Sequence, residues 1–268
     1  MNTLRPRAIL QLTGALTFRG LREQGRTILI NPLLLAVLFG FMICAALYFP
    51  FALTPPTRHA IDVGASHYGG SHQTAVALAV MLNQAPYLVA LFGAAVGSTL
   101  AQSLVGQEST RGGIELLLSG PYRLAEVLMA LLLVSFVLTA FSWLGLTLVS
   151  LAGSAVLFSV LHAALPVAGS RLALLLLFPL PLAYLSNLIA VILSIHFPQG
   201  AQNRGGGFDF FQMFAVAPAL IVLLIASFWP ALNPFGIAAV AMAAGIAGSA
   251  VAMTVVGRIF DPSSVLAS

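Results

Sequence analysis

The 268-residue chain has 11 basic and 7 acidic residues, and 60% of its residues are apolar. Charged residues therefore make up 7% of the chain, whereas soluble domains contain about 25%, so most of its length needs lipid as a solvent. Every basic residue is an arginine, which excludes a Walker-A lysine and a Schiff-base lysine. The charges lie at the ends of apolar segments and do not gather on one face, which argues against nucleic-acid binding. The composition predicts an all-α, polytopic integral membrane protein with a single domain over residues 1–268.

Residues 1–27 are too polar to cross a bilayer, because five arginines lie among them. Their apolar residues follow helical spacing approximately, which predicts an amphipathic helix on the membrane surface. The segment lacks the cleavage-site pattern of a secretory signal peptide, so we expect it to be retained.

The rest of the chain contains apolar segments of the length that a membrane-spanning helix needs, roughly 20 residues. Asn83, Gln84 and Pro86 interrupt the second of them, so we expect that helix to bend there. The predicted spans are residues 29–51, 75–102, 124–151, 172–196, 210–229 and 236–256.

Residues 152–165 are apolar but short for a span, so they are re-entrant, lie on the surface or form a seventh crossing. The arginine distribution favours six spans with both termini in the cytoplasm. Nine of the eleven arginines then face the cytoplasm, against eight if there are seven spans. We therefore expect a multi-pass protein of the plasma or inner membrane with six spans.

The segment of residues 103–123, between the second and third spans, contains a charged pattern. Glu108, Arg111 and Glu115 are spaced i, i+3 and i+7, so on a helix they share one face. Pro121 then ends the helix, because proline cannot continue it. The pattern predicts a short amphipathic cytoplasmic helix with a charged stripe, and an ordinary solvated loop is the alternative.

The run from Glu108 to Glu126 resembles the segment after the second span in permeases of the second type of ATP-binding-cassette (ABC) exporter. In that family the pattern is roughly Glu-x-x-x-Gly-Thr-Leu-Glu-x-Leu-Leu, followed by Pro and Glu. Here Gly113 stands in place of the usual threonine. The residues that carry the resemblance are Glu108, Arg111, Gly112, Glu115, Pro121 and Glu126. The Asn233–Pro234 turn before the last span also resembles the family.

The resemblance implies a non-catalytic permease subunit that forms the translocation path and couples to a separate ATPase subunit through these six residues. It further implies two ATPase copies that carry ATP and Mg, and a second permease copy, as a homodimer or a heterodimer. No cofactor is then expected on this chain, which independently lacks the Gly-x-x-x-x-Gly-Lys run of a P-loop. The apolar spans favour a hydrophobic or amphipathic substrate, such as a lipid-like molecule, a peptide or a drug-like molecule.

Asn83 and Gln84 are expected at membrane depth, where amides are costly unless they are paired. They either bond to another helix or line a substrate path, and the sequence favours neither.

The outer loop of residues 52–73 contains four side chains that could ligate zinc or copper. Their spacing fits no common metal signature, and the glycines and serines around them favour a flexible loop without a metal. These candidates are His59, Asp62, His67 and His72.

An ion-coupled secondary transporter or channel is the alternative function. Such proteins need an ionisable residue near the bilayer midplane, whereas all seven acids here lie in loops or at span ends. An intramembrane enzyme is disfavoured too, since the chain has no paired acids in a span and no His-Glu-x-x-His run.

Overall fold

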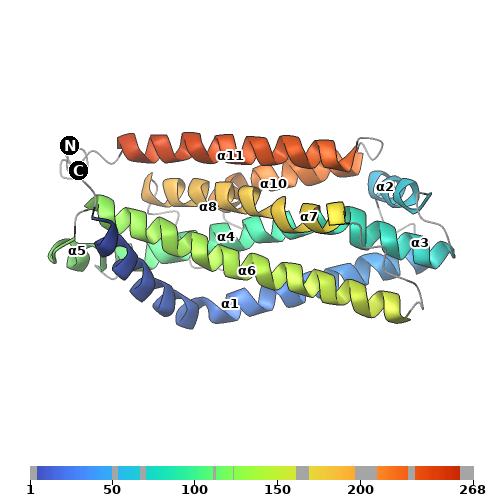
Figure 1. Ribbon diagram of the computed structural model, residues 1–268, viewed down its shortest axis with the longest axis horizontal. Coiled ribbons are helices and arrows are strands. Elements are labelled where there is room, and N and C mark those ends of the chain that lie inside the picture. The colour runs from blue at the N-terminus through green and yellow to red at the C-terminus, as the bar shows by residue number, and fades with distance from the viewer. Residues whose placement is uncertain are drawn as a thin grey trace.

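In the computed structural model, the described part of the chain consists of helices and contains no strand (Figure 1). The described residues are 5–49, 54–66, 71–110, 113–122, 124–160, 169–196, 210–228 and 233–259. The long helices lie side by side along the longest axis of the molecule. They are α1 (Pro6–Tyr48), α4 (Ala85–Thr110), α6 (Leu124–Val160), α8 (Pro179–His196), α10 (Phe210–Phe228) and α11 (Pro234–Ile259). The predicted all-α class is confirmed.

Four stretches of helix are long and apolar enough to cross a membrane: Ile28–Ala45, Ala85–Leu104, Glu126–Gly153 and Ala173–Ser194. Each lies largely within one of the first four predicted spans. The fifth and sixth predicted spans correspond to α10 and α11, whose apolar parts are shorter. The fold is thus compatible with a multi-pass membrane protein. That the chain crosses the membrane six times stays a prediction.

The centre of the bundle is formed by α4, which packs most extensively on α8 and also contacts α6, α10 and α1. Gly97 allows this packing, because a Cβ at this position would lie 2.9 Å from Thr139 Cγ2 of α6. The same Cβ would lie 3.4 Å from the carbonyl oxygen of Ala183 in α8. Gly97 therefore mediates a close contact between three helices of the same chain.

The predicted surface helix and the first predicted span are one continuous helix, α1, which changes direction part-way along (Figure 1). Pro32 lies inside it, and a proline removes one helical hydrogen bond and bends the helix. Ile9 and Leu12 of its first half are buried against Val127 and Leu131 of α6. One side of this half therefore packs on the bundle, and its position on a membrane surface stays a prediction.

The second predicted span is interrupted near the predicted place. It begins as α3 (His72–Leu78), continues as the π-helical segment η2 (Ala79–Gln84) and becomes α4 at Ala85. The segment ends just before Pro86, which has no amide hydrogen to donate and whose ring excludes the carbonyl four residues earlier. A wider π turn accommodates such a defect without ending the helix.

The polar loop expected over residues 52–73 is largely helical, which corrects the prediction of a flexible loop. Helix α2 (Pro55–Ser66) buries Ala60, Ile61 and Ala65, and it contacts α3, η2 and α10. The apolar residues recur at helical spacing between polar ones, so the average composition conceals a helix with one buried face.

Two further boundaries differ from the predicted spans. Residues 152–160 extend α6 by more than two turns, and residues 161–165 lie outside the described residues. The fourth predicted span is divided into α7 (Gly169–Leu177) and α8, with Phe178 between them. Pro179 starts α8, since a proline is tolerated in the first turn of a helix but not in its interior.

Candidate functional site

A short helix, α5 (Gly113–Leu118), connects α4 to α6 at one end of the bundle, which we call the α5 end. The start of α1 and the C-terminal end of α11 lie at the same end (Figure 1). The single helix expected to carry the charged stripe is instead two, because Glu108 is in the last turns of α4 and Glu115 is in α5. Arg111 and Gly112 lie outside the described residues, as do the side chains of Glu108 and Glu115.

An ion pair between Arg5 and Glu126 joins the start of α1 to the start of α6. Arg5 Nε donates to Glu126 Oε1 at 2.9 Å, and Arg5 Nη2 donates to Oε2 at 2.8 Å. The backbone N–H of Arg5 also donates to Oε1, at 3.2 Å. Arg5 Nη2 donates in addition to the carbonyl oxygen of Pro121, in the turn after α5. One guanidinium thus connects three segments of the chain.

The two partners of this pair are buried to very different degrees. The Glu126 side chain is 0% exposed, whereas the Arg5 side chain is 48% exposed. Glu126 lies in the first turn of α6, where the helix dipole also favours a negative charge. The hydrogen bond and the charge of Glu126 raise the pKa of Arg5 above its usual value. The guanidinium therefore stays protonated at every pH at which the protein can be handled.

Glu126, which the resemblance places among the coupling residues, is therefore inside the fold and presents no surface to a partner. Its observed contacts suit a residue that positions the α5 end. Arg5 was not singled out from the sequence, because 121 positions separate it from Glu126. One feature of the sequence did indicate that such a partner exists. Glu126 lies at the start of an apolar span, and a buried carboxylate needs a cation from another part of the chain.

The leucines of α5 are divided between its two sides. Leu117 packs against the cluster that contains Ile9 and Leu12 of α1 and Val127 of α6. Leu116, the residue before it, is 75% exposed. The helix ends where the Gly120 N–H donates to the Leu117 carbonyl oxygen at 3.3 Å. Leu116 is thus an exposed apolar side chain on a helix whose Leu117 packs against α1 and α6.

Buried polar side chains connect α6 to α8 in the middle of the bundle. Ser135 Oγ donates to Asn187 Oδ1 at 2.9 Å, and Asn187 Nδ2 donates to Thr139 Oγ1 at 3.4 Å. All three side chains are buried. They were missed from the sequence, where Asn187 is an isolated amide in an apolar run.

The amides predicted to lie at membrane depth, Asn83 and Gln84, are in η2. Gln84 is buried, and the side chain of Asn83 lies outside the described residues. Their pairing with another helix and their lining of a substrate path both stay predictions. A different amide does pair two helices, since Gln212 Nε2 of α10 donates to Thr99 Oγ1 of α4 at 2.6 Å.

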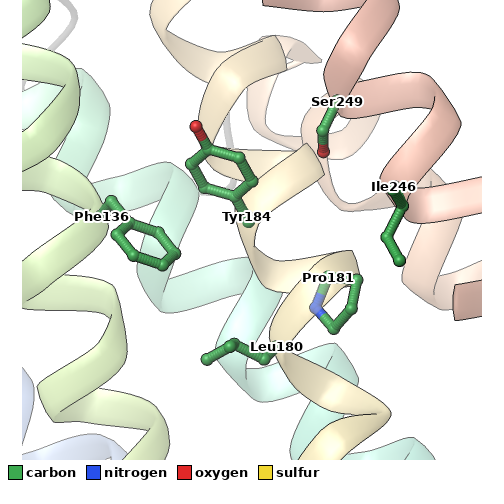
Figure 2. Close-up of a pocket in the computed structure, with 6 residues that line it drawn as sticks. All are labelled: Phe136, Leu180, Pro181, Tyr184, Ile246 and Ser249. Atoms are coloured by element: carbon green, nitrogen blue, oxygen red, sulfur yellow. The ribbon is translucent and has the colours of Figure 1, made fainter.

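A pocket of about 250 Å³ lies between α6, α8 and α11 (Figure 2). The rings of Phe136 and Tyr184 form one wall, with centroids 4.7 Å apart and planes at 74°. Ser249 lines the pocket, and within the described structure its buried hydroxyl has no hydrogen-bond partner. The remaining lining residues are Leu180, Pro181 and Ile246. The walls suit an apolar group, and Gln84 does not line this pocket.

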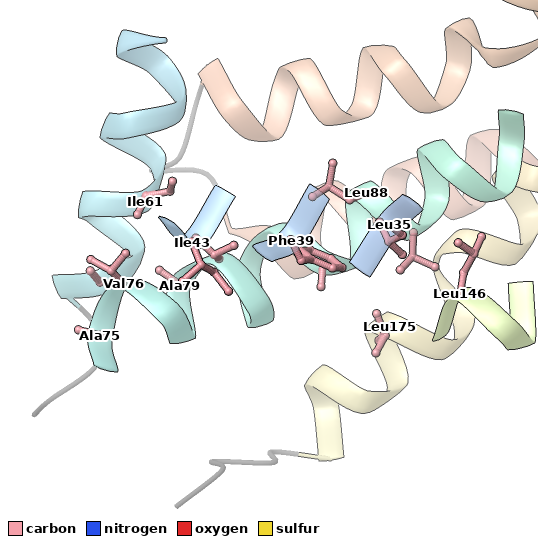
Figure 3. Close-up of a cluster of buried hydrophobic side chains, with 14 residues drawn as sticks. Leu35, Phe39, Ile43, Ile61, Ala75, Val76, Ala79, Leu88, Leu146 and Leu175 are labelled. Atoms are coloured by element: carbon pink, nitrogen blue, oxygen red, sulfur yellow. The ribbon is translucent and has the colours of Figure 1, made fainter. Parts of the chain in front are cut away.

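The opposite end of the bundle, which we call the α2 end, is filled by apolar side chains (Figure 3). Ile61 of α2 belongs to a buried cluster with Ile43 of α1 and Val76 of α3. The outer candidates His59 and Asp62 are exposed on α2, and His72 is exposed at the start of α3. His67 lies outside the described residues, and the described ones contain no group of three His, Cys, Asp or Glu that could hold a metal ion.

Comparison with known proteins gives no match to a protein-family model, to a curated protein or to a solved structure. The resemblance to ABC exporter permeases therefore depends on the residues of this chain alone.

Proposed function

We propose that the chain is the membrane subunit of an ATP-driven ABC exporter and that the α5 end docks a separate ATPase subunit. The observation that carries the proposal is the connection of Arg5 to Glu126 and Pro121. This connection, together with the packing of Leu117, ties α5 to both α1 and α6. A partner that moves α5 would therefore move helices that run the length of the bundle.

In this proposal, a movement of α5 reaches the other helices through particular connections and contacts. Helix α5 follows α4 and precedes α6 with short connections, so a load on α5 reaches both helices directly. The ion pair carries the load to α1, and the bond between Ser135 and Asn187 carries it from α6 to α8. Because the family's ATPases close as a pair, two permease copies complete the transporter, as a homodimer or a heterodimer.

The predicted coupling residues have different tasks in this proposal. Glu108, Arg111 and Glu115 contact a polar groove on the ATPase, where paired charges fix the register and like charges are costly. Leu116 adds an apolar contact, and Pro121 sets the turn that Arg5 fixes. ATP and Mg bind to the partner, and Gln84 and Asn83 line the path of a hydrophobic or amphipathic substrate.

Ion-coupled transport is disfavoured by the position of the buried charge. Among the described residues, Glu126 is the one acid whose side chain is buried, and it lies at the α5 end with Arg5 bound to it. A carboxylate that carries an ion must bind and release it near the midplane, which this fixed pair does not do.

The test replaces Arg111 with Glu and compares it with Arg58→Glu, a control on the exposed face of α2 at the opposite end. We expect the wild-type chain to co-purify with an ABC ATPase subunit, Arg111→Glu to lose that subunit, and Arg58→Glu to keep it. Both variants should insert and elute as the wild-type chain does. If no such ATPase binds the wild-type chain, or if both variants bind it equally, the proposal is wrong.

The orientation is tested by a single cysteine at Ser109, in a chain whose exposed Cys44 has been replaced. A membrane-impermeant thiol reagent should label it from the cytoplasmic side. Labelling only from the outside would reverse the orientation and remove the docking site from the reach of an ATPase.

A further inference from the structure

The first half of α1 has a buried side and an exposed side with different chemistry. Ile9 and Leu12 are buried against α6, whereas Leu10 and Phe18 are 67% and 76% exposed. Arg7, Arg22 and Arg26 are exposed as well. At 100° per residue, these exposed residues fall on one side of the helix. We call this set the arginine face: Arg7, Leu10, Phe18, Arg22 and Arg26.

The three arginines of this face form no ion pair with any described residue. Glu23 lies between Arg22 and Arg26 in the sequence, but its carboxylate is bound to Arg19. Arg19, on the flank of the face, is different, since its Nε donates to Glu23 Oε1 at 3.1 Å. The face therefore offers three arginines without an ion pair to a described residue, together with two exposed apolar side chains, Leu10 and Phe18.

The arginine face lies at the level where the apolar part of the bundle ends. Leu16, Leu21 and Ile28 all pack against one cluster, which contains Leu104 of α4 and Val134 of α6. Leu104 ends the apolar stretch of α4, and the apolar stretch of α1 begins at Ile28, two residues after Arg26. A straight helix perpendicular to the membrane would carry Arg7 about 30 Å away from that level. The change of direction in α1 keeps it closer (Figure 1).

We propose that the arginine face binds the headgroups of anionic phospholipids. Guanidinium groups pair with phosphate by parallel N–H···O bonds, and apolar side chains between them enter the boundary with the acyl chains. A zwitterionic headgroup gains less from three cations, because its own positive charge opposes them. Helix α1 is tied to α6 through Arg5 and Glu126, so lipid bound here also bears on the α5 end.

The test uses the purified full chain in a neutral detergent, without any ATPase, and compares phosphatidylglycerol with phosphatidylcholine by native mass spectrometry. We expect the wild-type chain to bind phosphatidylglycerol more tightly. Arg7→Gln, Arg22→Gln and Arg26→Gln should each lower that affinity about fivefold, the effect of one cation at an anionic surface. Their affinity for phosphatidylcholine should not change.

The matched control is the double variant Arg19→Gln with Glu23→Gln, because it removes an exposed ion pair from the same helix and leaves the net charge unchanged. It should keep the wild-type preference, and Phe18→Ala should weaken both lipids equally. All variants change exposed side chains, so each should keep the wild-type thermal midpoint.

Equal binding of the two lipids by the wild-type chain would overturn the proposal, as would an equal loss in Arg22→Gln and in the double variant of Arg19 and Glu23. A third contrary result is that Arg22→Gln leaves lipid binding unchanged but releases a co-purifying ATPase, which would assign the face to a protein partner. Because the lipid titration contains no ATPase, its outcome is separate from the test of the proposed function.

Discussion

Both ends of the bundle contain packed apolar side chains, and among the described residues the α5 end adds an ion pair with a buried partner. At the α5 end, the buried carboxylate of Glu126 is bound by the half-exposed guanidinium of Arg5, which precedes α1 and lies 121 positions away in the chain. At the α2 end, apolar side chains such as Ile61 and Val76 fill the space between α1, α2 and α3. Apolar packing stabilises a contact roughly in proportion to the area that it buries. A buried ion pair fixes one geometry and becomes costly when either charge is removed. This property suits the movement that the proposed function assigns to the α5 end.

The largest effect on stability is expected at the α2 end. Ile61→Ala removes a side chain that is 3% exposed and leaves a cavity. The free energy of unfolding should fall by about 3 kcal/mol, a loss on the order of 10 °C in the thermal midpoint. A thermal melt in detergent measures this, with Asp62→Ala, exposed on the same helix, as a control that should change little. In the proposed function, Ile61→Ala should still bind its ATPase.

An equal loss in Ile61→Ala and Asp62→Ala would show that α2 is not a packed part of the fold. Loss of the ATPase from a folded Ile61→Ala variant would show instead that the two ends are not separate in function.

The next effect is an asymmetry at the α5 end. Arg5→Ala leaves the carboxylate of Glu126 buried without its guanidinium, whereas Glu126→Gln leaves a half-exposed arginine that water can solvate. We expect Arg5→Ala to lower the thermal midpoint by on the order of 5 °C and Glu126→Gln to lower it less. The double variant should be more stable than Arg5→Ala alone, because the buried charge is then gone.

A double variant whose loss is the sum of the two single losses would contradict this view of the pair. Measurements at several pH values add a check. The pKa of Arg5 is raised in the folded chain, so its contribution is present below the unfolded pKa and is lost only as the pH rises through the still higher folded value. No loss that depends on Arg5 should therefore appear between neutral and mildly alkaline pH.

The helices could be predicted from the sequence because their signal is local. Runs of apolar residues placed α6 and α10 within the right segments, and Pro86 placed the interruption of the second span next to η2. Helix α2 was missed because its polar residues lower the mean hydropathy, although Ala60, Ile61 and Ala65 form a buried face.

The candidate site was predictable only in its location. The charged segment does contain a short helix, but the sequence cannot show that Glu126 points inward, because its partner Arg5 is far away in the chain. It also cannot show which leucine of α5 faces out. That depends on the tertiary contact of Leu117 with α1, and not on helical periodicity.

A smaller effect is expected between the two ends, at Asn187. Asn187→Leu removes the amide that joins α8 to Ser135 and Thr139. Both hydroxyls keep backbone acceptors, since Ser135 Oγ lies 3.1 Å from the Leu132 carbonyl oxygen and Thr139 donates to the Ser135 carbonyl oxygen at 2.7 Å. The loss should therefore be about 1 kcal/mol. Ser186→Ala, which removes a buried hydroxyl without a described partner, should cost less, and a greater cost there would contradict this ranking.

The smallest effect is expected for the second ion pair at the α5 end, Arg19 with Glu23. Its distance of 3.1 Å resembles that of Arg5 with Glu126, but its side chains are 43% and 33% exposed. Water can solvate either charge when the other is removed, and a basic residue before an acidic one is the weaker order on a helix. A double-mutant cycle with Arg19→Gln and Glu23→Gln should give a coupling of about 0.3 kcal/mol. A coupling as large as that between Arg5 and Glu126 would show that burial does not determine how much an ion pair stabilises the α5 end. A coupling of about 0.3 kcal/mol would indicate that the burial of Glu126 makes its pair the stronger one.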